Sequence, residues 1–173
     1  MQIQESTILE NRGGKMKFST QLNELFNAQV LHEMKNMMIY HQIQSYFEDL
    51  QLKNLASYFS KQAEDEHGHA KLFMQHINDR TGGKVELREI PFDGVQINSI
   101  DDIAKLFVET EEITTDLIEN LYSVAHESKS FIDLSFIEKM LQEQVEEEDS
   151  ANEFAIKIKM VKDLVLFDST FGE

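Results

Sequence analysis

Apolar side chains recur every three or four residues along most of this chain, which is the spacing that places them on one face of an α-helix. Four long segments carry this pattern, at residues 19–47, 52–78, 99–126 and 130–159. In the first segment the apolar face consists of Leu22, Phe26, Val30, Met37, Tyr40 and Phe47. At a rise of 1.5 Å per residue, helices of about 27 residues would each be about 40 Å long. The pattern therefore predicts an all-α protein built from four long helices.

The connections between these segments predict how the helices are arranged. Short connections follow the first and the third helix, and short connections join antiparallel neighbours. Residues 81–98 contain the only proline and show no helical periodicity, and at about 3.3 Å per residue they could span up to roughly 60 Å. We therefore expect a four-helix bundle of two antiparallel hairpins joined by a long crossover. Ser99 and Asp102 are placed to cap the third helix.

One acidic side chain interrupts the apolar face of each predicted helix. Glu33 precedes Glu66 by 33 residues, and the same interval separates Glu111 from Gln144. The second helix of each hairpin carries a pair of polar side chains three residues apart, which project from the same side of a helix. The two hairpins therefore repeat, and six side chains should converge halfway along the core. They are Glu33, Glu66, His69, Glu111, Gln144 and Glu147.

Four carboxylates in an apolar core would each lose much of their hydration energy if they remained unpaired. No Lys or Arg shares their apolar faces to compensate them. Divalent cations must therefore supply the missing positive charge. Four carboxylates, one imidazole and one amide suit two ions of intermediate hardness, such as iron or manganese. The absence of cysteine excludes iron–sulfur clusters, thiolate zinc sites and disulfides.

The composition limits which binding partners and which cellular compartment we expect for this protein. The chain has 32 acidic and 16 basic residues and a net charge of −16, which repels phosphate backbones, so we expect no nucleic-acid partner. No apolar run approaches the roughly 18 to 20 residues of a membrane span. The first 18 residues lack the apolar stretch of a signal peptide, so we expect a cytoplasmic protein with no membrane association.

Six stretches of the chain, taken jointly, are specific enough to indicate one family. They are HEMKNMMIYHQ around Glu33, SYFEDLQL, QAEDEHGHAKLF, NDRTGGKVELREIP, SIDDIAKLFVETEE around Glu111, and EQVEEE at residues 143–148. With them the chain resembles the non-haem ferritins of bacteria and archaea over nearly its whole length after Met16. The resemblance implies a ferritin-like bundle at residues 19–160, preceded by a flexible N-terminal extension at 1–18. Residues 161–173 would form a short tail or the remnant of a fifth helix.

In such ferritins the corresponding positions form a ferroxidase centre. The ligands that the resemblance implies are Glu33, Glu66 and His69 around one iron, and Glu66, Glu111 and Glu147 around the other, with Gln144 close by. The residues implied for a third iron, which some bacterial members hold, are Asp65, Glu143 and Glu146 beside Glu147. Asp65 is shorter than the glutamate usual in the family. Tyr40 is placed to hydrogen-bond a ligand carboxylate such as Glu111 and to donate an electron, although an amphipathic core tyrosine would occupy the same position.

The implied activity is the oxidation of Fe(II) to Fe(III), with O₂ or hydrogen peroxide as the electron acceptor. Carboxylate-rich sites favour Fe(III) because the higher charge gains more from anionic oxygen ligands. The resemblance further implies a homo-oligomer of twenty-four subunits whose hollow shell stores the ferric mineral. Only LVLFDSTFGE follows Asp163, and so short a fifth helix predicts wider or less ordered openings at the fourfold axes.

Two positions argue against a bound haem. Bacterioferritins carry a second Glu-x-x-His motif in their fourth helix and a haem-ligating methionine in their second. This chain has Glu147 in place of that histidine and His67 in place of that methionine, so we expect no haem. We interpret His67 as a solvated or subunit-interface residue. The other histidines away from the core acids are interpreted as surface residues: His32, His41, His76 and His126.

Three alternatives can be weighed on the sequence. Rubrerythrin-like peroxidases share the bundle, but their electron-relay module requires a Cys-rich rubredoxin site, and this chain has no cysteine. Mini-ferritins of starved cells place ligands across a subunit interface, whereas here one chain supplies a complete set. An acidic helical bundle that acts as an interaction or cation-buffering protein would require core acids without a catalytic role. Metal analysis of the purified protein separates that reading from a ferroxidase.

Overall fold

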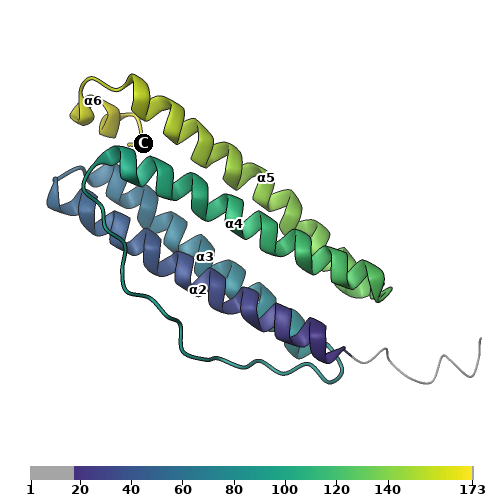
Figure 1. Ribbon diagram of the computed structural model, residues 1–173. Helices are drawn as coiled ribbons and strands as arrows, with labels where there is room; N and C mark the ends of the chain where they lie inside the picture. Colours follow the sequence, from purple (N-terminus) through teal and green to yellow (C-terminus); the bar gives the residue numbers. More distant parts are fainter. Residues whose placement is uncertain (1–17, 173) are drawn as a thin grey trace, which may run out of the picture.

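The structure is a computed structural model that describes residues 18–172. Within that range all regular secondary structure is helical, and four long helices lie side by side (Figure 1). The helices are α2 (Thr20–Asp49), α3 (Lys53–Asp79), α4 (Ile100–Glu127) and α5 (Phe131–Met160), followed by the short α6 (Leu164–Ser169). The prediction of an all-α four-helix bundle with a shortened fifth helix is confirmed. The extension expected at residues 1–18 lies outside the described residues, except for Phe18.

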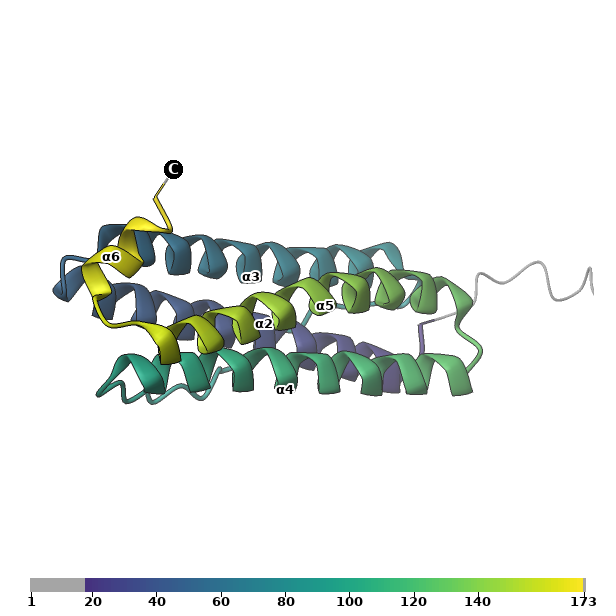
Figure 2. The same ribbon diagram turned by 90° about the horizontal axis from the view of Figure 1, so that it is seen from above.

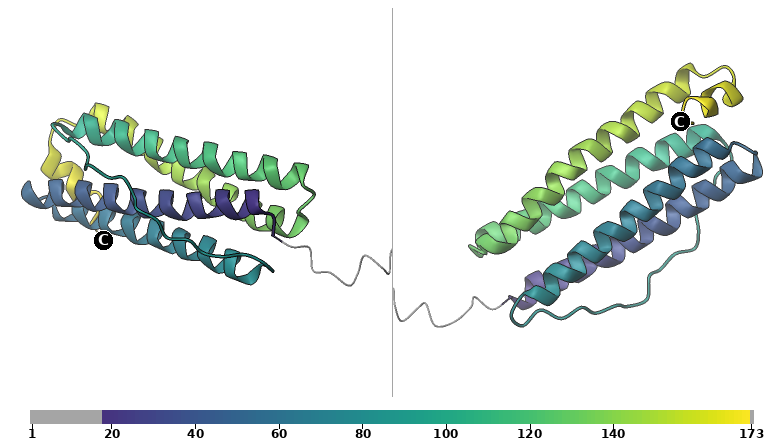
Figure 3. Two further views of the ribbon diagram at one scale, coloured as in Figure 1. Left: turned by 60° about the horizontal axis from the view of Figure 1, so that its bottom comes forward. Right: turned by 180° about the vertical axis from the view of Figure 1, so that it is seen from behind.

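Two antiparallel hairpins make up the bundle, α2 with α3 and α4 with α5 (Figure 1, Figure 2). Residues 80–99 leave the end of α3 and run along the outside of the bundle to its opposite end, where α4 begins (Figure 3). Because this crossover segment travels the length of the bundle, α3 and α4 point the same way, as the reach of the segment predicts.

Each hairpin turns on one residue in the left-handed region of backbone conformation, Gln51 with φ 59° and Lys129 with φ 54°. In both turns the N–H of the next residue donates to a carbonyl five residues back, at 2.9 Å. A residue other than glycine costs roughly 1 to 2 kcal/mol in this conformation. The repeat of the two hairpins therefore extends to their turns, although neither turn contains a glycine.

Side-chain amides of α2 hold the crossover segment against the helix. The Asn27 amide nitrogen donates to the Lys84 carbonyl at 2.8 Å, and the Asn27 oxygen accepts from the Glu86 N–H at 2.6 Å. Gln42 pairs with both backbone groups of Val95 in the same way, at 2.6 and 3.0 Å. These two-point contacts satisfy backbone groups in a segment that has no secondary structure of its own.

Helix α4 begins at the capping box that the sequence predicts, with the Ser99 hydroxyl accepting from the Asp102 N–H and the Asp102 carboxylate accepting from the Ser99 N–H. Helix α3 has no side-chain cap at its own N-cap residue. Instead Asp168, in α6, accepts from the Leu55 N–H at 2.8 Å and from the Asn54 side chain at 3.1 Å. The carboxylate also lies at the positive end of the α3 dipole. The short helix α6 therefore supplies a side-chain cap for the N-terminus of α3.

The bundle core consists of two apolar clusters with a polar layer between them. Among the buried residues of α2, Val30 is the last member of one cluster and Ile39 is the first member of the other. Glu33 and Asn36, both buried, lie between them. Each cluster contains at least two fully buried phenylalanine rings, and burying such a ring contributes roughly 1.5 to 3 kcal/mol. The clusters stabilise the bundle, and the layer between them holds the polar groups of interest.

Two histidines interpreted as surface residues are partly buried, and that interpretation was wrong for them. His76 Nε2 lies 2.7 Å from the buried carboxylate of Asp133, and His32 Nε2 lies 2.9 Å from the Thr114 hydroxyl. Their partners belong to α5 and α4, and the helical pattern of one segment does not reveal which side chains a neighbouring helix brings. The two histidines that are exposed, as expected, are His41 and His126.

Candidate metal centre

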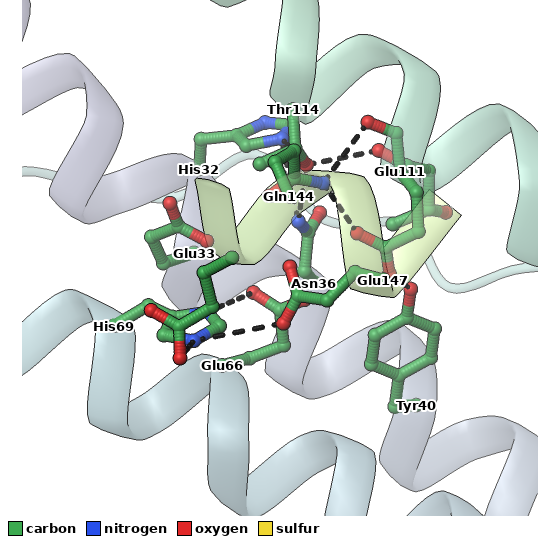
Figure 4. Close-up of polar contacts among 12 residues, drawn as sticks. His32, Glu33, Asn36, Tyr40, Glu66, His69, Glu111, Thr114, Gln144 and Glu147 are labelled. Carbon is green, nitrogen blue, oxygen red and sulfur yellow. Dashed lines mark hydrogen bonds and ion pairs between the residues drawn. The ribbon is translucent and has the colours of Figure 1, made fainter. Parts of the chain in front are cut away.

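All four long helices contribute side chains to one polar layer in the middle of the bundle (Figure 4). The layer contains Glu33, Asn36 and Tyr40 from α2, Glu66 and His69 from α3, Glu111 from α4, and Gln144 and Glu147 from α5. Within each helix these residues are three, four or seven positions apart, so they project from one face. The structure therefore brings together the six side chains whose spacing in the sequence suggested convergence.

Glu33, Glu66 and His69 form the tightest group in the layer. Each offers a ligand atom, and these atoms lie within 4.8 Å of one another. The three residues are 0, 2 and 6% exposed. The Gln29 amide donates to Glu33 Oε1 at 2.7 Å, which fixes one carboxylate oxygen and leaves the other available to a ligand.

The second hairpin completes the layer with Glu111 and Glu147. The Tyr40 hydroxyl donates to Glu111 Oε1, and the Gln144 amide donates to Glu111 Oε2 at 2.9 Å. Glu147 reaches from α5 to within 3.6 Å of His69 Nε2 on α3. Tyr40 and His69 belong to the first hairpin, so these contacts join the two hairpins across the layer.

Three buried carboxylate oxygens in the layer accept no hydrogen bond, namely Oε2 of Glu33, of Glu66 and of Glu147. Within residues 18–172, the ion pairs that reach these carboxylates involve His69 and neither lysine nor arginine. A buried carboxylate without a partner is costly. Protons or bound cations must therefore neutralise the layer, and the donor set of carboxylates, imidazole and amide fits iron.

The electrostatics of the layer follow from burial and crowding. Burial raises the pKa of Glu33 well above its ordinary value, and the neighbouring Glu66 carboxylate raises it further. Burial also raises the pKa of Glu66 and of Glu111, and raises that of Glu147 to about 8. Burial opposes the charged form of His69, but the carboxylates of Glu147 and Glu33 outweigh it and raise its pKa. The metal-free layer therefore holds protons that a cation would displace.

Of the residues implied for a third iron, only Glu143 contacts the layer, between α3 and α5. The Glu143 side chain is 49% exposed and lies 3.5 Å from His69 Nε2. Asp65 and Glu146 are exposed. Within the described residues, the group of three acidic or histidine side chains whose ligand atoms lie close together is Glu33, Glu66 and His69. The structure thus brings Glu143 to the layer and does not gather Asp65 and Glu146 with it.

Neutral polar side chains beside the carboxylates were missed from the sequence. Asn36 and Thr114 are 1 and 2% exposed, and Asn36 Nδ2 donates to Thr114 Oγ1 at 3.0 Å. Burial lowers the pKa of the adjacent His32 to about 4, so this ring is neutral at pH 7. Glu148 is also partly buried and accepts a hydrogen bond from the Thr115 hydroxyl. Asn36 follows Glu33 by three residues and Thr114 follows Glu111 by three, and this helical spacing is the signal that could have located them.

A family model described as a ferritin-like domain matches residues 23–161. The chain belongs to the ferritin family. The bacterial non-heme ferritin of Staphylococcus haemolyticus is 32% identical to it over 132 residues, which are 76% of this chain and 79% of that protein. Ferritin-2, a chloroplastic protein of Nicotiana tabacum, is 31% identical over 153 residues, which are 84% of this chain and 59% of that protein. The chain thus spans about three fifths of this plant relative.

Solved ferritins have a similar structure. A ferritin of the hyperthermophilic archaeon Archaeoglobus fulgidus, described as a novel open pore ferritin, aligns with a TM-score of 0.84 and 26% identity. The alignment covers 89% of this chain and 96% of that one. The resemblance to bacterial and archaeal non-haem ferritins is therefore confirmed. No helix within residues 18–172 is long and apolar enough to cross a membrane.

Proposed function

We propose that this ferritin is an iron-storage subunit that oxidises Fe(II) to Fe(III) in the polar layer, with O₂ or hydrogen peroxide as acceptor. The observation that supports this most directly is the buried group of carboxylates with unpartnered oxygens and, within residues 18–172, no lysine or arginine partner. Such a group is unfavourable unless cations enter it, and it retains open coordination positions for them. Iron is the substrate of this site and becomes the stored cargo.

Two iron ions occupy the layer side by side in this proposal. The ligands are Glu33, Glu66 and His69 for one ion, and Glu66, Glu111 and Glu147 for the other, with Gln144 close by. Glu66 is suited to bridge because its carboxylate interacts with Glu33 on its own hairpin and with Glu111 and Glu147 on the other. Four carboxylates stabilise Fe(III) more than Fe(II), which makes the bound Fe(II) easier to oxidise.

Tyr40 acts on this centre through Glu111. Its hydroxyl donates to Glu111 and holds one oxygen of that carboxylate in place. Burial and the negative charge of Glu111 raise the pKa of Tyr40 well above its ordinary value, so the phenol stays protonated and continues to donate. As a buried phenol beside a ligand carboxylate, Tyr40 is also placed to supply an electron to the oxidant.

Iron approaches the layer between α3 and α5, where carboxylates are available at the surface. Glu143 is the nearest of them, because it already lies beside His69. A third iron is held transiently by Glu143 with Asp65 and Glu146, which lie on the exposed faces of the same two helices. The shorter Asp65 side chain makes this the weakest of the three positions.

The subunits assemble into a hollow shell of twenty-four copies with wide openings at the fourfold axes. Helix α6 has only 6 residues, too few to form a fifth helix that lines such an axis. Large apolar side chains are exposed at this end of the bundle, with Met160, Val165 and Leu166 at 73, 72 and 68%. Apolar surface of this kind marks a contact between proteins. Light scattering of the purified protein tests the assembly, and a dimer as the only species, even after iron loading, would refute the shell.

Haem is not expected in this protein. His67, at the position where a haem-ligating methionine would stand, is exposed on α3, and Glu147 faces the polar layer near His69. The absorption spectrum of freshly purified protein should lack an intense Soret band. A band corresponding to about one haem per two subunits would contradict this part of the proposal.

The direct test of the iron centre compares Glu66→Ala with Glu64→Ala. Both substitutions remove one carboxylate from α3, but Glu66 is buried in the layer and Glu64 is exposed. Loss of the bridging ligand should slow rapid Fe(II) oxidation by about a hundredfold, the upper end of the effect expected when even an outer partner of a metal ligand is removed, while Glu64→Ala should oxidise normally. Equal rates for the two variants, measured by stopped-flow absorbance, would rule out the assignment. Tight Fe(II) binding without oxidation in the unmodified protein would instead favour the cation-buffering alternative.

A further inference from the structure

A surface pocket of about 420 Å³ lies over the polar layer, between α2, α4 and the crossover segment. Residues that line it include His32, Asn36, Phe92, Thr110 and Ile113. Asn36 also belongs to the polar layer, where it is buried and lies beside the Glu66 and Glu147 carboxylates (Figure 4). One side chain therefore separates the pocket from a proposed iron ligand.

The floor of this pocket is polar but carries no carboxylate. Asn36 Nδ2 donates to Thr114 Oγ1 at 3.0 Å, and Thr114 Oγ1 donates to the Thr110 carbonyl at 2.9 Å. His32 Nε2 lies 2.9 Å from the same Thr114 oxygen and 3.3 Å from the Asn36 nitrogen. We call these four residues the neutral seam. Figure 4 shows how Asn36, Thr114 and His32 lie beside the ligand carboxylates.

The opposite side of the layer has a different character. Between α3 and α5, Glu143 and Glu147 lie 3.5 and 3.6 Å from His69 Nε2, and their side chains are 49 and 18% exposed. Carboxylates there continue from the surface to the ligands, and such oxygens replace the water around a divalent cation as it enters. On the pocket side the charged residues lie only at the exposed rim: Lys35, Asp93 and Glu109. A cation that passed this rim would meet no anionic ligand in the neutral seam.

We propose that the pocket and the neutral seam form the entrance for hydrogen peroxide, which Thr114 and Asn36 pass to the iron centre by hydrogen bonding. The inference rests on the proposed ferroxidase function. Hydrogen peroxide both donates and accepts hydrogen bonds, so hydroxyl and amide groups replace the water around it. It is also uncharged, and it enters without the desolvation cost of an ion. O₂ gains nothing from such groups, and the polarity of the seam therefore distinguishes the two oxidants.

The chemistry on this route balances. Two Fe(II) ions each give one electron to a hydrogen peroxide molecule, its O–O bond breaks, and two protons complete two molecules of water. Hydrolysis of the two Fe(III) ions that result returns these protons. The oxidant enters beside Glu66 from the α2–α4 side, while iron enters between α3 and α5, so the two substrates do not compete for one path.

The first test removes the hydroxyl at the centre of the seam with Thr114→Val. Anaerobic Fe(II) binding, measured by calorimetry, should be unchanged. Oxidation at limiting hydrogen peroxide should slow about fivefold, the effect of one lost neutral hydrogen bond, while the rates at saturating peroxide and with O₂ should not change. Thr114→Ser keeps the hydroxyl and should restore the rate. Thr115→Val is the matched control, because that hydroxyl bonds Glu148 and takes no part in the seam.

The second test closes the pocket from its rim and leaves the seam intact. Ile113 lines the pocket and is 52% exposed, so Ile113→Trp can fill the opening without disturbing the core. Leu117, one turn further along α4 and 39% exposed, does not line the pocket, which makes Leu117→Trp the matched control. The apparent affinity for hydrogen peroxide should fall in Ile113→Trp and stay the same in Leu117→Trp.

The outcomes separate the entrance from the ferroxidase function. Normal peroxide dependence in both Thr114→Val and Ile113→Trp, in proteins that bind Fe(II) normally, would overturn the entrance and leave the iron site standing. Loss of Fe(II) binding in Thr114→Val would also overturn it, because Thr114 would then support the ligands. An unmodified protein that neither binds nor oxidises Fe(II) would overturn the proposed function itself.

Discussion

Buried acids occur in two places in this bundle, and they are neutralised in opposite ways. Where α3 ends and α5 begins, the fully buried Asp133 lies 2.8 Å from Arg80 Nε and 2.7 Å from His76 Nε2, and it also accepts from the Ser130 hydroxyl. In the polar layer, four carboxylates lie near one histidine, and among the described residues no ion pair joins them to a lysine or arginine. The Asp133 cluster carries its own cation, Arg80, within the folded chain. The polar layer, by contrast, must take up protons or bound cations to become neutral.

The pKa values differ in the same way. Burial favours the neutral form of Asp133, but hydrogen bonds from His76 and Ser130 and the charge of Arg80 outweigh it, so the pKa of Asp133 is lowered. In the layer burial prevails, and the pKa of Glu147 rises to about 8. Opposite shifts within one bundle therefore distinguish the internally paired Asp133 from the carboxylates of the proposed metal centre.

The largest effect should follow from removing the cation of the Asp133 cluster with Arg80→Met, which keeps much of the side-chain volume. The buried Asp133 carboxylate would lose its charged partner, and the free energy of unfolding should fall by about 3 kcal/mol. Urea denaturation measures the change.

Arg88→Met is the control for that loss. Arg88 pairs with Glu86 at 2.8 Å, but its side chain is 68% exposed, and a surface pair contributes about 0 to 1 kcal/mol. Equal losses of stability in Arg80→Met and Arg88→Met would show that the Asp133 cluster does not depend on its cation.

A second prediction concerns pH in the metal-free protein. The folded-state pKa of Glu147 is raised from 4.5 to about 8, so the unfolded chain loses this proton first and stability should fall as pH rises between those values. We expect a loss of roughly 2 kcal/mol or more between about pH 5 and pH 8. For Asp133 the sign is reversed, because its lowered pKa gives stability that is lost as pH falls below its ordinary 3.8.

Urea midpoints at several pH values, with and without Fe(II) under anaerobic conditions, measure this difference. Binding of Fe(II) should displace the protons of the layer and remove the decline above pH 5. Calorimetric titrations in buffers of different ionisation enthalpy should therefore report proton release. Binding without any release would mean that the layer is already ionised in the metal-free protein.

The smallest expected effect is a gain in stability from Glu33→Gln. The amide keeps the acceptor that Gln29 uses and removes one of the mutually repelling acids. The metal-free protein should be more stable by about 1 kcal/mol at pH 8, while Fe(II) binding weakens. Glu24→Gln, at an exposed position on the same helix, should change neither quantity. A less stable Glu33→Gln protein would indicate that the layer is not strained by its own charge.

Much of this architecture could be predicted because the signals are local. Helix α4 begins at Ser99 and Asp102, and both partners of that capping box are three residues apart in the sequence. The 33-residue interval between buried polar residues could be read directly, since each long helix keeps its polar residues on an otherwise apolar face. By contrast, Asp133 lies in the first turn of α5, where an acidic residue is ordinary at the surface, and its burial was not expected.

The sequence alone determined the helices, the parallel course of α3 and α4, and which acids share a level of the bundle, because these depend on periodicity and on the reach of a connecting segment. Only the tertiary structure decided which side chains meet across helices. Asp133 pairs with an arginine 53 residues away, Asp168 caps a helix 113 residues earlier, and Asn36 meets Thr114 across 78 residues. Each of these contacts depends on the rotation and axial register of two helices, which packing of the whole core sets and no local pattern encodes.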